Sequence, residues 1–228
     1  MMRVVSLVPS ATETLLAWGI TPVGVTRFCE QPEYQSVGGT KNPDLATIGA
    51  LRPDLVVMNT EENRREDADA LRSAGLRVHA IDITVIEDVA PELQRLAEAV
   101  GIPFRPTPDP SLTPRAQLPV FVPIWRRPWM TIAPNTYGAS LLSRLGWQAI
   151  APASSDRYPE VTLEYVRAQH PVAILVPSEP YAFRAEHLRE LAAIAPVQRI
   201  DGKDLFWWGV RTPSALRRLD AAIHTLRR

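Results

Sequence analysis

The sequence predicts an α/β protein built from two lobes, each a parallel sheet flanked by helices, with a cleft between the lobes. Short runs rich in β-branched residues alternate with amphipathic stretches, an order typical of parallel sheets covered by helices. The length of 228 residues fits one large domain or two small ones, at about 150 residues per domain. Proline contributes 22 residues, about twice its ordinary share, which argues against a bundle of long helices.

The first half begins with a predicted strand at Val4–Val8. Ser10 and Glu13 have the spacing of a capping box, which predicts that Ser10 caps a helix from about Ala11 to Trp18. Three further pairs of strand and helix follow before residue 100. The predicted strands are Pro22–Val25, Leu55–Met58 and Arg77–Ile81, and the predicted helices are Asp44–Leu51, Asn63–Ala74 and Thr84–Val100.

The segment Gly101–Pro119 holds six prolines and has no periodic pattern. We interpret it as a stiff, extended linker between an N-terminal lobe, residues 1–100, and a C-terminal lobe, residues 120–228. Motifs recur in the same order in the two halves, so the lobes are predicted to be similar. The matches are Pro9-Ser10 with Pro134-Asn135, Arg52–Val57 with His170–Leu175, and Val78–Asp82 with Val197–Asp201.

Composition excludes several classes of function. The 25 basic and 25 acidic side chains balance, so no nucleic-acid partner is expected. The single cysteine, Cys29, excludes an internal disulfide, and the four histidines lack ligand spacing, so we expect no metal site. There is no apolar run of about 18 residues and no signal peptide, so we expect no membrane insertion and, for the chain as written, a cytoplasmic location. Motifs such as G-x-S-x-G and H-E-x-x-H are absent, so we expect no catalytic residues and no enzyme.

The candidate binding residues are aromatic and lie in segments that follow predicted strands. Trp125 and Trp129 lie in one such segment, Phe206–Trp208 form the second, and Phe28 lies in the third. Rigid rings offer a large flat ligand wide apolar contact at little entropic cost. The alternative is that these rings pack a small core. Cleft and core are equally favoured for Trp125, whereas the adjacent Trp207 and Trp208 cannot easily both point inward.

Polar residues are expected at the same ends of the strands. The helix starts after Ser10 and Asn135 would offer free amides to a ligand. Glu61 and Glu62 lie at the start of a predicted helix, where negative charge complements the helix dipole, so no functional role is needed to explain them. Glu179 directly follows an apolar strand, which makes it a stronger candidate for a functional role.

Several of these segments resemble one known family. The run Arg3–Glu13 is similar to the opening of the class III substrate-binding proteins of ABC importers, and the cobalamin-binding (BtuF-type) members, also called helical-backbone metal receptors, are the most similar. The resemblance covers nearly the whole chain. It also rests on Pro22–Thr26, Val37–Thr40, Leu51–Val56, Leu71–Val78, Trp125–Tyr137 and Val176–Phe183.

The resemblance implies two Rossmann-like lobes that hold a metal chelate, such as a corrinoid, haem or ferric siderophore, with no covalently bound cofactor. It implies an ABC permease as partner, and we expect a monomer. The implied ligand contacts are Ser10, Phe28, Trp125, Trp129, Tyr137, Glu179, Phe206, Trp207 and Trp208, and the implied permease contacts are Glu62, Glu66 and Glu179.

The sequence departs from the family in three places. Asn59 stands where the resemblance leads us to expect a tryptophan, and the proline-rich Gly101–Pro119 replaces the long helix that joins the two lobes. The third is the start of the chain, where the exported family members carry a secretion signal, so the resemblance implies a periplasmic or extracellular location if the start codon is misassigned.

The function that we predict is non-catalytic binding of a corrinoid or cobalamin-like metal chelate in the cleft between the lobes, as in ABC-type uptake. Two alternatives remain open at this point. One is a cytoplasmic enzyme or chaperone of tetrapyrrole or related metabolism on the same scaffold, and the other is an interaction module without a ligand.

Overall fold

The computed structural model describes residues 2–111, 115–154 and 156–227. Its chain divides into two compact units, each described by itself below. Unit 1 comprises Met1–Ile83, Glu87–Thr107 and Trp208–Val210, and unit 2 comprises Thr84–Ile86, Pro108–Trp207 and Arg211–Arg228. The boundaries predicted at residues 100 and 120 stay a prediction.

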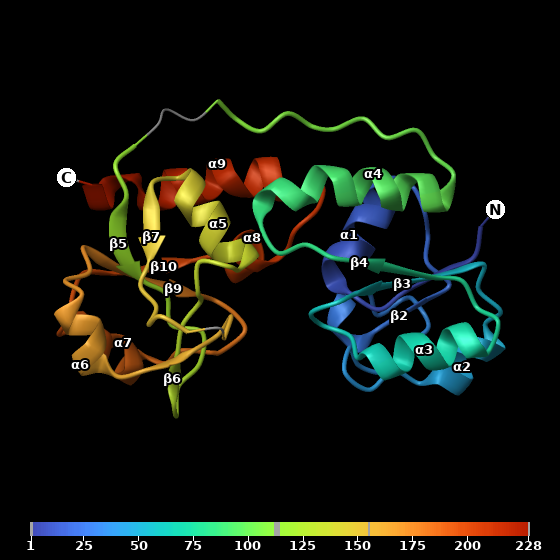
Figure 1. Ribbon diagram of the computed structural model, residues 1–228, viewed down its shortest axis with the longest axis horizontal. Helices are drawn as coiled ribbons and strands as arrows, with labels where there is room; N and C mark the ends of the chain where they lie inside the picture. Colours follow the sequence, from blue (N-terminus) through green and yellow to red (C-terminus); the bar gives the residue numbers. More distant parts are fainter. Residues whose placement is uncertain (1, 112–114, 155, 228) are drawn as a thin grey trace. The chain divides into compact units, whose positions relative to one another are not determined.

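Unit 1 contains a four-stranded parallel sheet in the order β2-β1-β3-β4. Its strands are β1 (Val4–Ser6), β2 (Gly24–Val25), β3 (Leu55–Asn59) and β4 (Val78–Ile81). Its helices are α1 (Pro9–Ala17), α2 (Leu45–Ala50), α3 (Arg65–Ser73) and α4 (Val89–Val100), with a 3-10 turn η1 (Arg27–Cys29), and a second turn η2 (Ile86–Asp88) precedes α4. Each predicted strand of this half is therefore present, and the predicted α/β class is confirmed (Figure 1).

Burial explains why these strands have few polar residues. Every residue of β1 and β3 is buried, as expected for central strands of a parallel sheet covered on both faces. Val5 of β1 and Val56 of β3 pack with Ile48 and Leu71 of the helices in one buried cluster. Each such side chain stabilises the folded state by about 1.5–3 kcal/mol by leaving water. β4 at the edge of the sheet is only partly buried.

The capping box predicted at Ser10 is wrong. Helix α1 begins at Pro9, and its N-cap is Val8, whose side chain makes no capping hydrogen bond. Proline suits the first helical position because its fixed φ fits a helix and its missing N–H would have no helical partner there. Ser10 therefore lies within the first turn and is buried.

Unit 2 contains a second four-stranded parallel sheet, in the order β10-β9-β5-β7. Its strands are β5 (Leu118–Phe121), β7 (Trp147–Ala149), β9 (Ala173–Pro177) and β10 (Val197–Ile200). A small antiparallel pair joins β6 (Trp129–Met130) to β8 (Glu160–Val161). Its helices are α5 (Tyr137–Arg144), α6 (Leu163–Ala168), α7 (Ala185–Ala192), α8 (Gly202–Phe206) and α9 (Thr212–Ile223), and a 3-10 turn η3 (His224–Arg227) ends the described chain.

The second unit contains a buried apolar cluster. Phe121, Ile174, Val166 and Leu191 are buried in it, and Phe183 connects it to the aromatic residues described below. The helix predicted to start after Asn135 is capped by Thr136, whose hydroxyl accepts from the Ala139 amide. No helix among the described residues is long and apolar enough to cross a membrane.

The proline-rich segment has neither helix nor strand at residues 102–111 and 115–117, in agreement with the predicted absence of a connecting helix. Gly101 ends α4 with φ at +77°, a conformation that glycine adopts without strain. Phe104 then packs edge-on against Trp18 of unit 1 at 6.2 Å between ring centroids. In unit 2, Asp109 pairs with Arg144 of α5 at 3.3 Å.

Candidate functional site

An aromatic cluster lies at the carboxyl end of the sheet in unit 2, where parallel sheets usually bind ligands. Trp125 follows β5 and meets Tyr181 edge to face at 5.0 Å between centroids. Tyr181 contacts Phe183 at 4.8 Å, and Phe183 stacks on Trp129 at 5.9 Å with only 5° between the ring planes. The predicted residues Trp125 and Trp129 are thus joined through two rings of the segment after β9.

The cluster runs from the core to the surface. Phe183 is buried, whereas Trp125 is 46% exposed and, with Phe28, is one of two large apolar side chains that are exposed among the described residues. The Arg126 guanidinium lies over the Trp129 ring, 5.4 Å from its centroid, and pairs with Glu190 at 2.9 Å. A fixed aromatic surface with one accessible ring can receive the flat face of a large ligand.

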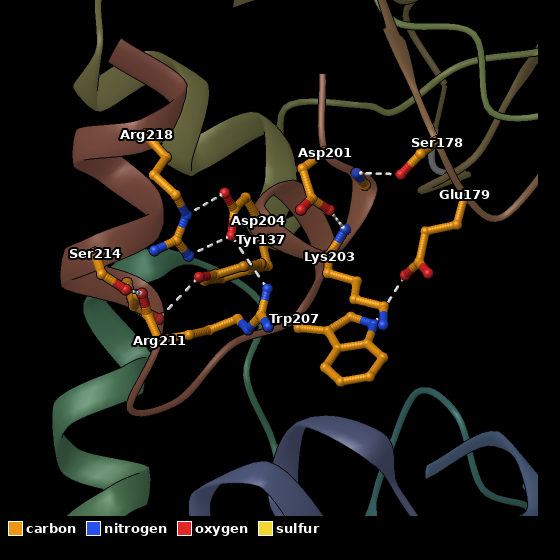
Figure 2. A network of polar contacts seen from close by, with 12 residues as sticks. Tyr137, Ser178, Glu179, Asp201, Lys203, Asp204, Trp207, Arg211, Ser214 and Arg218 are labelled. Atoms are coloured by element: carbon orange, nitrogen blue, oxygen red, sulfur yellow. Dashed lines mark hydrogen bonds and ion pairs between the residues drawn. The ribbon is translucent and has the colours of Figure 1, made fainter. Parts of the chain in front are cut away.

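A second group of residues surrounds Trp207 (Figure 2). The indole Nε1 of Trp207 donates to a carboxylate oxygen of Glu179 at 2.8 Å. The Lys203 ammonium lies 4.9 Å from the ring centroid and the Arg211 guanidinium 5.2 Å from it. Such cation–π contacts stabilise by about 0.5–2 kcal/mol, depending on burial. The ring is therefore held at its edge and over its face.

Asp204 of α8 is the buried centre of this group. Its carboxylate accepts two bonds from Arg218, at 2.7 and 2.5 Å, and one from Arg211 at 3.1 Å. Tyr137, at the start of α5, is buried beside it, and its hydroxyl shares a 2.9 Å hydrogen bond with Thr212. Burial raises the pKa of Tyr137 above its ordinary value, and the Thr212 contact opposes that shift only in part. The phenol therefore keeps its proton at neutral pH.

The carboxyl ends of the strands in unit 1 carry a different set of residues. Phe28 in η1 is 49% exposed, with the Arg27 guanidinium 4.9 Å from its ring centroid. Next to it, Cys29 is buried against the hydroxyls of Thr12 and Thr26, each 3.2 Å from the sulfur. Burial raises the pKa of the Cys29 thiol, so this residue behaves as a small apolar side chain.

Asn59 organises the turn after β3. Its side-chain oxygen accepts from the backbone amides of Glu61 and Glu62 at 2.9 and 3.0 Å, and its backbone amide donates to the side-chain oxygen of Asn63 at 2.8 Å. This buried residue stands where the family resemblance suggests an aromatic ring. In this chain the position therefore has a structural role in the turn.

The remaining predicted site residues differ in accessibility. Ser10, Tyr137 and Trp208 are buried, with Trp208 only 4% exposed. Phe206 and Glu62 are half-buried, and Glu66 is exposed in the first turn of α3. Gly209, beside Trp208, comes so close to α1 that an added Cβ would lie 2.3 Å from the Thr14 hydroxyl oxygen.

Tyr181 and Phe183 were not predicted individually as site residues. The signal was present, since both belong to the segment Val176–Phe183 and follow the apolar strand β9. No group of three or more histidine, cysteine, aspartate or glutamate side chains that could hold a metal ion occurs in the described part of the chain.

Several known proteins are similar to this chain. The vitamin B12-binding protein of Salmonella paratyphi A is 30% identical over 195 residues, which cover 76% of this chain and 71% of that protein. The vitamin B12-binding protein of Photorhabdus laumondii is 24% identical over 198 residues, covering 77% and 70%. No protein-family profile matches the chain.

Solved structures support the fold. The periplasmic vitamin B12-binding protein BtuF of Vibrio cholerae has a TM-score of 0.78 at 18% identity, covering 100% of this chain and 98% of that one. The periplasmic heme-binding protein RhuT of Roseiflexus sp. RS-1 also has a TM-score of 0.78, at 21% identity and 100% and 99% coverage. Both neighbours are periplasmic binding proteins by name.

Fold and relatives together define a periplasmic-type binding protein and not an enzyme, as predicted. More specifically, the chain belongs to the family of vitamin B12-binding proteins, the BtuF-type members of the class III periplasmic binding proteins. The family resemblance predicted from Arg3–Glu13 and the other quoted segments is confirmed.

Proposed function

We propose that this protein binds a corrinoid metal chelate and delivers it to the permease of an ABC importer, acting as a monomer. The observation that carries the proposal is the 30% identity to a vitamin B12-binding protein over 76% of the chain. The aromatic cluster of unit 2 supports it, because a corrin ring is a broad macrocycle whose face needs apolar contact. The exposed Trp125, backed by Tyr181, is the ring best suited to supply that contact.

The further contacts of the ligand are part of the same proposal. Phe28 of unit 1 is exposed and held by Arg27, so it can offer a second aromatic contact. Ser10, Tyr137 and Trp208 are buried and would act by shaping the elements that carry the contacts. For permease docking, the exposed Glu66 and the half-buried Glu62 are the candidates in unit 1, while Glu179 already accepts a bond from Trp207.

Ligand titration followed by tryptophan fluorescence tests the proposal. We expect cyanocobalamin or cobinamide to quench the fluorescence with micromolar or tighter affinity, and Trp125→Ala to weaken binding at least about tenfold, the equivalent of 1.4 kcal/mol. Trp18→Phe is the matched control, because Trp18 contacts Phe104 and not the cluster. Haem is titrated in parallel.

Two results would overturn the proposal. Tight binding of haem without binding of either corrinoid would assign the site to another chelate. The absence of binding to all three compounds would refute chelate binding altogether.

Import also requires a location outside the inner membrane, as for the periplasmic neighbours. Sequencing the N-terminus of the natural protein tests this part. A mature end generated by removal of a leader supports import, whereas an unprocessed end on a protein found in the cytoplasmic fraction contradicts it.

A further inference from the structure

Trp207 is held by a hydrogen bond from its edge to Glu179, a residue 28 positions away in the sequence. Trp207 is the C-cap residue of α8, and its backbone amide donates to the Lys203 carbonyl at 2.9 Å. The backbone alone leaves the indole free to rotate about its side-chain torsions. The 2.8 Å bond from Nε1 to Glu179 removes that freedom, because an indole has a single N–H donor.

Glu179 is itself fixed by the start of α8. An added Cβ on Gly202 would lie 2.5 Å from the Glu179 Cγ and 2.7 Å from its amide nitrogen, so the two segments touch closely enough to require glycine. The Gly202 amide also donates to the hydroxyl of Ser178 at 2.9 Å. These contacts place the carboxylate within reach of the indole (Figure 2).

The arginine over the Trp207 ring is held by a buried carboxylate. Arg211, over the Trp207 ring at 5.2 Å, is paired with the buried Asp204 at 3.1 Å. Asp204 is also held by Arg218, so Arg211 cannot move without disturbing a buried carboxylate. Glu179 is thus the contact at the indole edge, and Arg211 belongs to the contacts over the face.

From this geometry we infer that Glu179 is a positioning residue, which orients the Trp207 ring for contact with the chelate by accepting its N–H bond. This inference rests on the proposed function for the ligand, but the orientation of the ring is a property of the free protein. It gives Glu179 a role within unit 2 that does not involve direct contact with a ligand or a permease.

Indole N–H resonances of ¹⁵N-labelled protein test the orientation without ligand. The Trp207 resonance is identified as the one that disappears in Trp207→Phe. We expect Glu179→Ala to shift it, and Glu179→Gln, which keeps an acceptor oxygen, to leave it close to its original position. Glu164→Ala is the matched control, since Glu164 is an exposed acid of the same unit that pairs locally with Arg167. An unmoved Trp207 resonance in Glu179→Ala would overturn the inference.

Cyanocobalamin titration tests the consequence for binding. We expect Glu179→Ala to weaken binding up to about tenfold, because the ligand would then have to order a freed indole ring, and Glu179→Gln to restore most of the affinity. In a Trp207→Phe background, which lacks the N–H donor, the alanine substitution should cause no further loss. A loss that persists in that background, or that glutamine fails to rescue, would show that Glu179 acts in another way.

The two proposals fail differently. If the unaltered protein binds no chelate, the proposed function is refuted while the indole resonance still reports whether Glu179 orients Trp207. If binding is intact but the alanine variant retains full affinity, the proposed function stands and the positioning role is refuted.

Discussion

Replacing Asp204 should cost more stability than replacing any exposed acid of unit 2. The Asp204 side chain is 3% exposed and pairs with Arg211 and Arg218, whose side chains are 16% and 52% exposed. Removing one partner of a buried ion pair costs about 3–5 kcal/mol, because the other charge stays desolvated. Arg218 can turn toward water, whereas the less exposed Arg211 side chain loses this carboxylate with less access to water. We therefore expect Asp204→Ala to lower the free energy of unfolding by about 3 kcal/mol.

The comparison that isolates burial is Asp220→Ala. Asp220 also pairs with an arginine, Arg115, but their side chains are 23% and 30% exposed. More exposed pairs of this kind are worth about 0.2–1 kcal/mol, so we expect a loss of under about 1 kcal/mol. Urea unfolding followed by circular dichroism gives both values. A loss for Asp204→Ala that is equal to or smaller than that for Asp220→Ala would refute the argument from burial.

Two further predictions concern a glycine and a histidine of unit 1. Gly209→Ala should destabilise the protein by more than about 2 kcal/mol, because the position combines a φ of +116° with an added Cβ only 2.3 Å from the Thr14 hydroxyl oxygen. Gly75→Ala, at φ +80° with no atom within 4 Å of the added Cβ, should cost only about 1 kcal/mol. Thermal unfolding compares the two variants, and equal losses would contradict the steric argument. Burial lowers the pKa of His79 below 6.5, against an opposing effect of Glu92, and its Nε2 has no hydrogen-bond partner in the described part of the chain. The unfolded chain then binds the proton at higher pH than the folded one, so stability should fall as the pH drops below about 6.5 and level off below the folded pKa. His79→Gln should reduce this pH dependence, as measured by urea midpoints at several pH values, and an unchanged dependence would exclude His79 as a cause.

Local patterns in the sequence predicted most of the secondary structure. The buried runs at Val4–Val8 and Leu55–Met58 have the composition of central parallel strands, and β1 and β3 lie within one residue or two of those limits. The start of α1 was placed incorrectly because two local signals compete there. The side chains of Ser10 and Glu13 favour a capping box, but Pro9 fits the first helical position and the helix begins with it.

The candidate site was only partly accessible to the same reasoning. Trp125 and Trp129 were singled out as aromatic residues in a loop after a strand, but the rings that join them, Tyr181 and Phe183, come from a segment more than fifty residues later. The burial of Trp208 and the exposure of Trp125 depend on what packs around each ring. No spacing in the sequence reveals that difference.

The sequence alone therefore determined the class of fold, the order of strands and helices in the first half, the lack of helix at the described residues 102–111 and 115–117, and the family, because these depend on local periodicity, on proline and on recognisable motifs. Only the tertiary structure decided which side chains meet: Trp207 with Glu179, Asp204 with Arg211 and Arg218, and Trp125 with Tyr181. The physical reason is that such contacts arise where strands and helices distant in the chain pack side by side, and the free energy of each contact depends on burial that only the folded chain creates.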